Sequence, residues 1–155
     1  MAVDRVLTTA QATYAAMLRD QVAPRLRELG LRGSGGSYLL PNDRWWALIG
    51  FQRDRHSDAA QVRFTVDVAR ADKAVWEAAR VEHPWLPPRP TANTHYPVGE
   101  VIRIGQLLPA RVDTWWAVPA GGATDASADE VLRAIRDHAL PWMRERLGPA
   151  APSRS

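Results

Sequence analysis

The chain has 155 residues, enough for one domain of ordinary size that buries a hydrophobic core without disulfides or metals. It contains no cysteine, which excludes disulfides, thiolate zinc sites and cysteine nucleophiles, and no stretch reaches the roughly 18 apolar residues of a membrane span. The net charge is only +3, because 17 acidic residues are interleaved with 20 basic ones, so nucleic-acid binding is not expected.

The first predicted element is a helix over residues 8–29. Pro24 lies inside this stretch and predicts a kink or a restart, and Gly30 fits the position just after the helix, where glycine is the residue of lowest cost. The apolar side chains recur at three- and four-residue spacing, and they are Tyr14, Met17, Leu18, Val22, Leu26 and Leu29.

A glycine-rich segment, residues 33–37, follows this helix. It lacks the lysine of a phosphate-binding loop and leads into a strand over residues 38–40 instead of a helix. The sequence therefore favours a flexible entry to a strand over a phosphate-binding site.

Residues 44–53 form the most apolar run of the chain and carry Trp45 and Trp46. Side chains alternate between the two faces of a strand, and both faces are apolar near the start of this run, which predicts a central strand covered on both sides. One face would carry Trp45, Ala47, Ile49 and Phe51, and the other Trp46, Leu48 and Gln52. The clear alternation over residues 62–68 predicts its antiparallel neighbour.

Residues 71–82 predict a short helix whose inner side is Val75, Trp76 and Ala79. Residues 83–97 contain five prolines and predict a long loop, which we expect Trp85 and Leu86 to hold against the body of the protein. Loops of this length in a compact domain are often functional.

The last part of the chain predicts strands over residues 100–108 and 111–119, then a helix to about residue 147. Ser127 and Glu130 have the spacing of a capping box at the start of that helix, Pro141 predicts a second kink, and Gly148 would cap the end. Arg136-Asp137 before Pro141 repeats Arg19-Asp20 before Pro24, a likeness that we interpret as coincidence.

Six short motifs, in this order and spacing, resemble the uncharacterised bacterial domain-of-unknown-function family 4304. The likeness spans about residues 8–145 and implies an α+β domain; it supplies no activity. Leu31 departs from it, because an aromatic residue is expected after the glycine. The motifs are Pro24-x-Leu26 before Gly30-Leu31-Arg32, Phe51-Gln52-Arg53, the strand 62–68, Arg103-Ile104-Gly105-x-Leu107, Asp113-x-Trp115-Trp116 and Leu140-Pro141-Trp142.

No catalytic set and no metal site is evident in the sequence. The four histidines, at positions 56, 83, 95 and 138, share no metal-ligand spacing, and no serine lies in a nucleophile-elbow motif. Asp67 and Asp113 could act as paired carboxylates only if their strands are neighbours and both side chains point to the same face, and ion pairing with Arg63 or Arg103 is the favoured interpretation.

The wetter face of the sheet is the candidate site. Tryptophan and arginine are good binding anchors, because they offer a large rigid surface and a planar charged group. The alternative is that the proline-rich loop or a helix covers the outer tryptophans and forms a second, minor core. The candidate residues are Trp46, Arg53, Arg63, Asp67, Arg103 and Trp116.

The sequence thus predicts an α+β fold: an antiparallel sheet of four to five strands, with the N- and C-terminal helices packed on one face. We expect a single domain over residues 1–148 and a disordered tail over 149–155. The amino terminus lacks the layout of a signal peptide, so we expect a cytoplasmic protein.

Two functions remain open. The first is a non-catalytic protein-interaction or binding module that uses the tryptophan–arginine face, without a cofactor. The second is a small-molecule-binding protein or enzyme with a pocket between the sheet and the proline-rich loop, holding Arg53, Arg63, Arg103 and Asp67.

Overall fold

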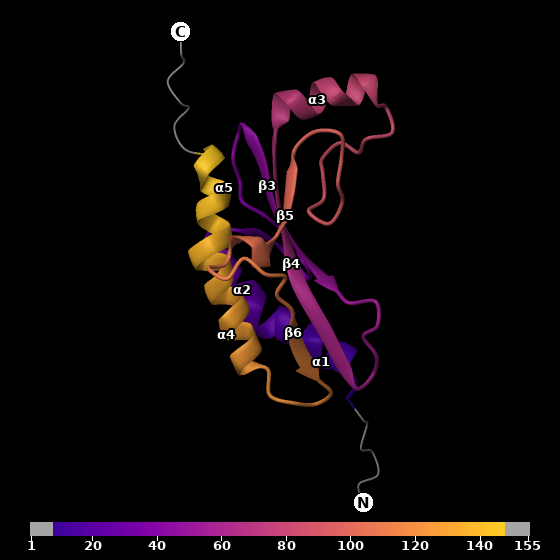
Figure 1. The fold of residues 1–155 in the computed structure, drawn as a ribbon, viewed down its shortest axis with the longest axis vertical. Coiled ribbons are helices and arrows are strands. Elements are labelled where there is room, and N and C mark those ends of the chain that lie inside the picture. The colour runs from indigo at the N-terminus through magenta and orange to yellow at the C-terminus, as the bar shows by residue number, and fades with distance from the viewer. Residues whose placement is uncertain (1–7, 148–155) are drawn as a thin grey trace, which may run out of the picture.

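The computed structural model describes residues 8–147 and contains one antiparallel sheet between two unequal layers of helix and loop (Figure 1). The predicted α+β class is confirmed. The predicted tail and the predicted cap at Gly148 lie outside the described residues. The strands are β1 (Arg32–Ser34), β2 (Ser37–Leu39), β3 (Trp45–Arg53), β4 (Gln61–Asp72), β5 (Glu100–Arg103) and β6 (Trp116–Pro119).

Strand β4 is the centre of the sheet. It pairs along its length with β3, from Trp45 opposite Asp72 to Arg53 opposite Phe64. Its other edge pairs with β5 through residues 67–70 and with β6 through residues 61–64. The sheet continues from β3 to β2 and β1, because the glycine-rich segment forms a hairpin instead of a flexible entry, and it therefore has six strands.

Helices from both ends of the described chain cover one face of the sheet, which we call the inner face (Figure 1). The first set is α1 (Ala10–Met17), the π-helical turn η1 (Leu18–Val22) and α2 (Ala23–Glu28); the second is α4 (Asp125–Ala134), the π-helical turn η3 (Ile135–Ala139) and α5 (Leu140–Leu147). Their apolar stripes pack with Ala47, Ile49, Phe51 and the residues Val62, Phe64, Val66 and Val68 into the main core. The expected packing of both terminal helices on one face is confirmed.

Both kinks occur where proline was expected to cause them, and both take the form of a π-helical turn. A proline ring clashes with the carbonyl four residues earlier and provides no N–H. In each turn the backbone bond spans five residues, from Ala23 N–H to the Leu18 carbonyl and from Leu140 N–H to the Ile135 carbonyl. The repeated motif thus corresponds to the same local structure in both helices.

The other face, here the outer face, is partly covered by α3 (Lys73–Glu82) and the loop over residues 83–97. Trp76 is fully buried there beside Ala79, Leu86 and Ala71, and Trp46 packs against the same cluster. A second, minor core therefore exists. Two details of the prediction were wrong: Val75 is 50% exposed and Trp85 is 65% exposed. Leu86 is buried, as expected.

Two predicted strands are shorter in the structure, and one predicted cap is wrong. After Arg103 the chain turns into the 3₁₀ helix η2 (Ile104–Leu107), and residues 111–115 are not part of a strand. A Cβ at Gly105 would lie 2.1 Å from the Val112 carbonyl oxygen. The backbones at these two residues are therefore so close that only glycine fits at position 105. Helix α4 begins at Asp125, and the Ser127 hydroxyl donates to the Ala117 carbonyl instead of capping it.

Candidate functional site

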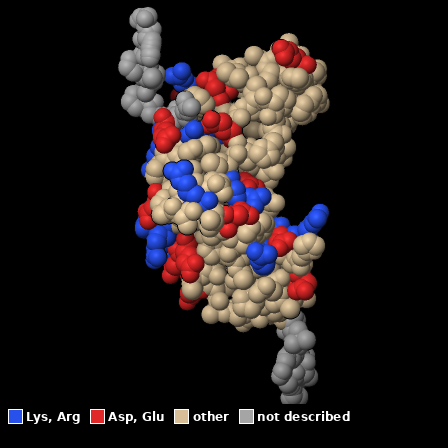
Figure 2. All heavy atoms as spheres, viewed as in Figure 1, with Lys and Arg blue, Asp and Glu red and all other residues tan. Residues whose placement is uncertain are grey.

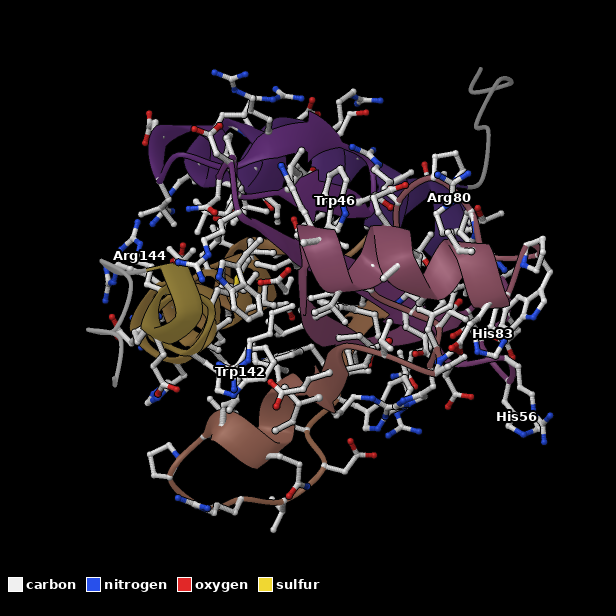
Figure 3. All side chains as sticks on the ribbon, turned by 90° about the horizontal axis from the view of Figure 1, so that it is seen from above. Trp46, His56, Arg80, His83, Trp142 and Arg144 are labelled. Atoms are coloured by element: carbon white, nitrogen blue, oxygen red, sulfur yellow. The ribbon has the colours of Figure 1, made fainter. Side chains whose placement is uncertain are left out.

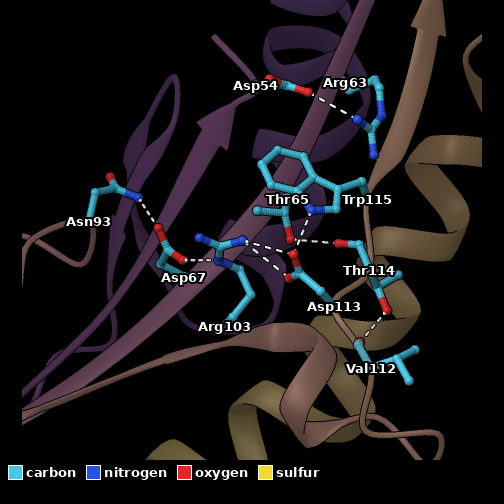
Figure 4. A network of polar contacts seen from close by, with 10 residues as sticks. All are labelled: Asp54, Arg63, Thr65, Asp67, Asn93, Arg103, Val112, Asp113, Thr114 and Trp115. Carbon is cyan, nitrogen blue, oxygen red and sulfur yellow. Dashed lines mark hydrogen bonds and ion pairs between the residues drawn. The ribbon is translucent and has the colours of Figure 1, made fainter. Parts of the chain in front are cut away.

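Three large side chains meet on the outer face along the amino-terminal half of β4. Arg63 extends from β4, Arg103 from β5, and Trp115 from the segment just before β6 (Figure 4). The guanidinium carbon of each arginine lies 5.3 Å from the centroid of the Trp115 ring, within the range of a cation–π interaction. We call Arg63, Arg103 and Trp115 the arginine–tryptophan cluster.

Carboxylates hold the two arginines in place. Arg103 donates through Nε to Asp67 at 2.9 Å and through Nη1 to Asp113 at 3.1 Å, and the Trp115 indole N–H donates to the same Asp113 at 2.8 Å. The predicted pairing of both aspartates with a strand arginine is thus confirmed. Since Asp67 is buried, its bond to Arg103 is a charge-assisted contact with little access to water.

Arg63 is held separately, through Asp54 in the loop that follows β3. The two side chains form an ion pair at 3.0 Å. The backbone N–H of His56 donates to Asp54 and lowers the pKa of this carboxyl, and the positive charge of Arg63 adds to the effect. Asp54 is therefore charged at neutral pH, and Arg63 keeps its position beside Trp115.

Strand register decides which tryptophan of the pair faces outward. Trp116 lies opposite Phe64 on β4 and therefore shares its inner face, where the two rings stack at 5.7 Å. The prediction that Trp116 belongs to the outer face was wrong, and Trp115 occupies that place. The Thr65 hydroxyl donates to the Thr114 carbonyl at 2.6 Å, which fixes the backbone of the segment that carries Trp115.

The remaining predicted residues lie elsewhere. Trp46 is on the outer face, as expected, but it lies beside the start of α3, with Lys73 Nζ 4.5 Å from its ring centroid (Figure 3). Arg53 is two residues after Phe51 on β3 and lies opposite Phe64 on β4. Its side chain is therefore on the inner face of the sheet, near Tyr14. Burial raises the pKa of Tyr14, and the charge of Arg53 opposes that effect. The structure thus brings together Arg63, Asp67 and Arg103 and separates the other three.

One contributor was missed by the sequence interpretation. Asn93, in the proline-rich loop, donates from Nδ2 to Asp67 at 2.7 Å. Its side chain lies over Gly50, where an added Cβ would be 2.5 Å from the Asn93 Oδ1 atom. A glycine inside an otherwise apolar strand is a signal of such close approach, and it could have pointed to a residue lying on β3.

The three aspartates around the cluster, Asp54, Asp67 and Asp113, already accept hydrogen bonds from arginine, asparagine, indole or backbone N–H groups. Over residues 8–147 no group of three histidines, aspartates or glutamates is placed to hold a metal ion, and no helix is both long and apolar enough to cross a membrane. On the face drawn in Figure 2, basic and acidic side chains are interleaved, which gives no continuous basic surface for a nucleic acid.

These features define an α+β domain in which a polar, arginine-rich cluster occupies the part of the sheet that helices leave open. The family described as "Domain of unknown function (DUF4304)" matches residues 22–145, which is most of the chain. The protein belongs to this family, and the resemblance of the sequence motifs is confirmed. Comparisons with curated proteins and with solved structures give no match.

Proposed function

We propose that this domain is a non-catalytic protein-interaction module and that the arginine–tryptophan cluster is the centre of its interface. The observation that carries the proposal is the position of Trp115, partly exposed and flanked by two arginines on a sheet face that α3 and the loop 83–97 leave uncovered. Tryptophan and arginine are, with tyrosine, the residues enriched at the energetic centres of protein interfaces.

The cluster is also held ready for binding. Arg63 is 47% exposed and Arg103 32% exposed, yet both are fixed by ion pairs to Asp54, Asp67 and Asp113. Side chains that are already ordered lose less conformational entropy when a partner binds. Val112, which is 57% exposed, adds an apolar surface beside them.

The charges indicate what kind of partner fits. Two arginines and three aspartates lie side by side, so the surface is neither strongly basic nor strongly acidic. Such a surface suits a folded protein with its own mixed charges, because complementary pairs fix the orientation of the two molecules.

The test is an affinity capture from the host lysate with three forms of the tagged protein: wild type, Trp115→Ala and Trp85→Ala. Trp85 is a matched control, since it is exposed and lies in the loop outside the cluster. We expect a stoichiometric protein partner to bind wild type and Trp85→Ala, and its affinity for Trp115→Ala to fall about 30-fold, the effect of losing about 2 kcal/mol at a binding centre.

Circular dichroism and thermal unfolding of the three forms establish that each is folded. A partner retained equally by folded Trp115→Ala would overturn the proposal, and so would the absence of any stoichiometric partner of the wild type.

A further inference from the structure

A second concave surface lies on the outer face, on the far side of β3 from the arginine–tryptophan cluster. It is a groove of about 390 Å³ between the strands β1 to β3 and the proline-rich loop. The predicted pocket between sheet and loop was assigned to Arg53, Arg63, Asp67 and Arg103, and this groove has a different lining. It is lined by Arg32, Gly33, Ser37, Tyr38, Leu39, Leu48, Ile49, Arg89, Pro90, Thr91 and Ala92.

The floor of the groove is apolar. Leu39 on β2 and Leu48 on β3 are register partners, so their side chains lie next to each other on the outer face. Both pack with Ala92 of the loop in the same small apolar cluster. The floor is therefore built by the sheet on one side and by the loop on the other.

The walls of the groove carry positive charge without compensation. Arg32 on β1 and Arg89 in the loop are exposed, and neither forms an ion pair with another described residue. The lining contains no acidic residue. The groove between α2 and α4 differs in this respect, since its arginines share the lining with Glu28 and Asp129.

We propose that the groove between β1–β3 and the loop binds a small molecule with an anionic headgroup on a short apolar body. The guanidinium groups of Arg32 and Arg89 hold the headgroup, because their planar donors match the geometry of carboxylate and phosphate oxygens. The body lies on Leu39, Leu48 and Ala92. The volume falls within the range of small-molecule sites, and the site does not depend on the role of Trp115.

The probe is octanoate, measured by isothermal titration calorimetry and by amide chemical shifts in ¹H–¹⁵N spectra. Octan-1-ol, which has the same chain length without the charge, is the paired neutral probe. We expect octanoate to shift the amide signals of residues 37–39 and 89–92 and to bind at least about tenfold more tightly than octan-1-ol, a difference of about 1.4 kcal/mol.

The variant is Arg32→Gln/Arg89→Gln, and its matched control is Arg55→Gln/Arg144→Gln, which removes two exposed arginines outside the groove. We expect the groove variant to weaken octanoate binding at least about tenfold and the control to change it less than about twofold. Equal losses in both variants would show only a response to net charge and would overturn the proposal. Binding of octan-1-ol as tight as that of octanoate, or shifts confined to other residues, would overturn it as well.

Discussion

Gly50 lies in the middle of β3, opposite Asp67, and leaves the space that the Asn93 side chain occupies. A methyl group at Gly50 would displace the Asn93 amide from Asp67, a buried carboxylate. We therefore expect Gly50→Ala to lower the free energy of unfolding by about 1.5–3 kcal/mol, the range for a lost hydrogen bond to a charged group. Urea denaturation measures this difference.

A double-mutant cycle separates this effect from a general intolerance of β3. In an Asn93→Ala background the amide is absent, so Gly50→Ala should cost much less than it does in the wild type. Additive losses in the cycle would contradict the assigned contact between the two residues.

The acid limb of stability should depend on Asp54. Its pKa is lowered in the folded protein, chiefly by the His56 backbone N–H, so the unfolded chain binds its proton first as the pH falls. The stabilisation is therefore complete above the ordinary carboxyl pKa of about 4 and is lost as the pH falls through that value toward the lowered one.

We expect Asp54→Asn to flatten the decline of thermal stability in this pH range, and Ala60→Ser, in the same loop, to leave the decline unchanged. A decline in Asp54→Asn as steep as in the wild type would contradict this assignment.

Alternate residues of a strand point to the same face, and this rule applied along β3 and β4 was sufficient to place the side chains of Arg63, Asp67 and Leu48 on the outer face. The same counting was wrong for Trp116, because residues 111–115 do not pair with β4 and give no register to count from. The choice between Trp115 and Trp116 depends on which residue pairs with Phe64, and that is decided by tertiary contacts such as the Thr65 to Thr114 hydrogen bond.

At the scale of elements, α3 and the loop over residues 83–97 form one layer held by few contacts. Trp76 is fully buried, and its indole N–H donates to the Pro87 carbonyl at 3.1 Å, which ties the helix to the loop. We expect Trp76→Ala to lower the free energy of unfolding by about 3–5 kcal/mol, the range for removing a large buried aromatic side chain. Limited proteolysis should then cleave this variant faster within the loop.

The matched control for this layer is Trp85→Ala, since Trp85 is nine residues further along the chain and is exposed. Its unfolding free energy should stay within about 0.5 kcal/mol of the wild type, as for most surface substitutions. Similar losses in both variants would show that α3 and the loop do not form the minor core described above.

The helices illustrate how far periodicity alone can lead. The apolar spacing predicted both terminal helices and their inner sides, and the prolines predicted both kinks. The π-helical form of the kinks was not predicted, because it depends on keeping Leu18, Val22 and Leu26 in the core on both sides of Pro24. Likewise, Ser127 has the sequence of a cap, but its hydroxyl is taken by the neighbouring strand β6.

At the scale of the whole molecule, Arg70 joins the sheet to the last helix. It is buried on the inner face of β4, where it pairs with Glu100 of β5, donates to the Trp142 carbonyl at 2.7 Å and lies 3.7 Å from the centroid of the Trp142 ring. We expect Arg70→Met to lower the free energy of unfolding by about 1–3 kcal/mol, because methionine keeps an apolar chain of similar length but removes the guanidinium that donates to the Trp142 carbonyl.

The measurement is again urea denaturation, with Arg70→Lys as the companion variant. Lysine keeps the charge but cannot reach Glu100 and the Trp142 carbonyl with one planar group, so we expect an intermediate loss. A variant Arg70→Met as stable as the wild type would show that α5 is held by apolar contacts alone.

The main core has a consequence for synthesis of the protein on the ribosome. Its helical cover comes from residues 10–28 and 125–147, whereas the strands that it covers lie between them. While the chain is being translated, Phe64, Val118 and their neighbours are made before Leu132, Ile135 and Met143 exist to shield them. A nascent chain that pauses before Asp125 would therefore expose part of the apolar inner face of the sheet, so correct folding of this protein should depend on chaperones until its last helix emerges.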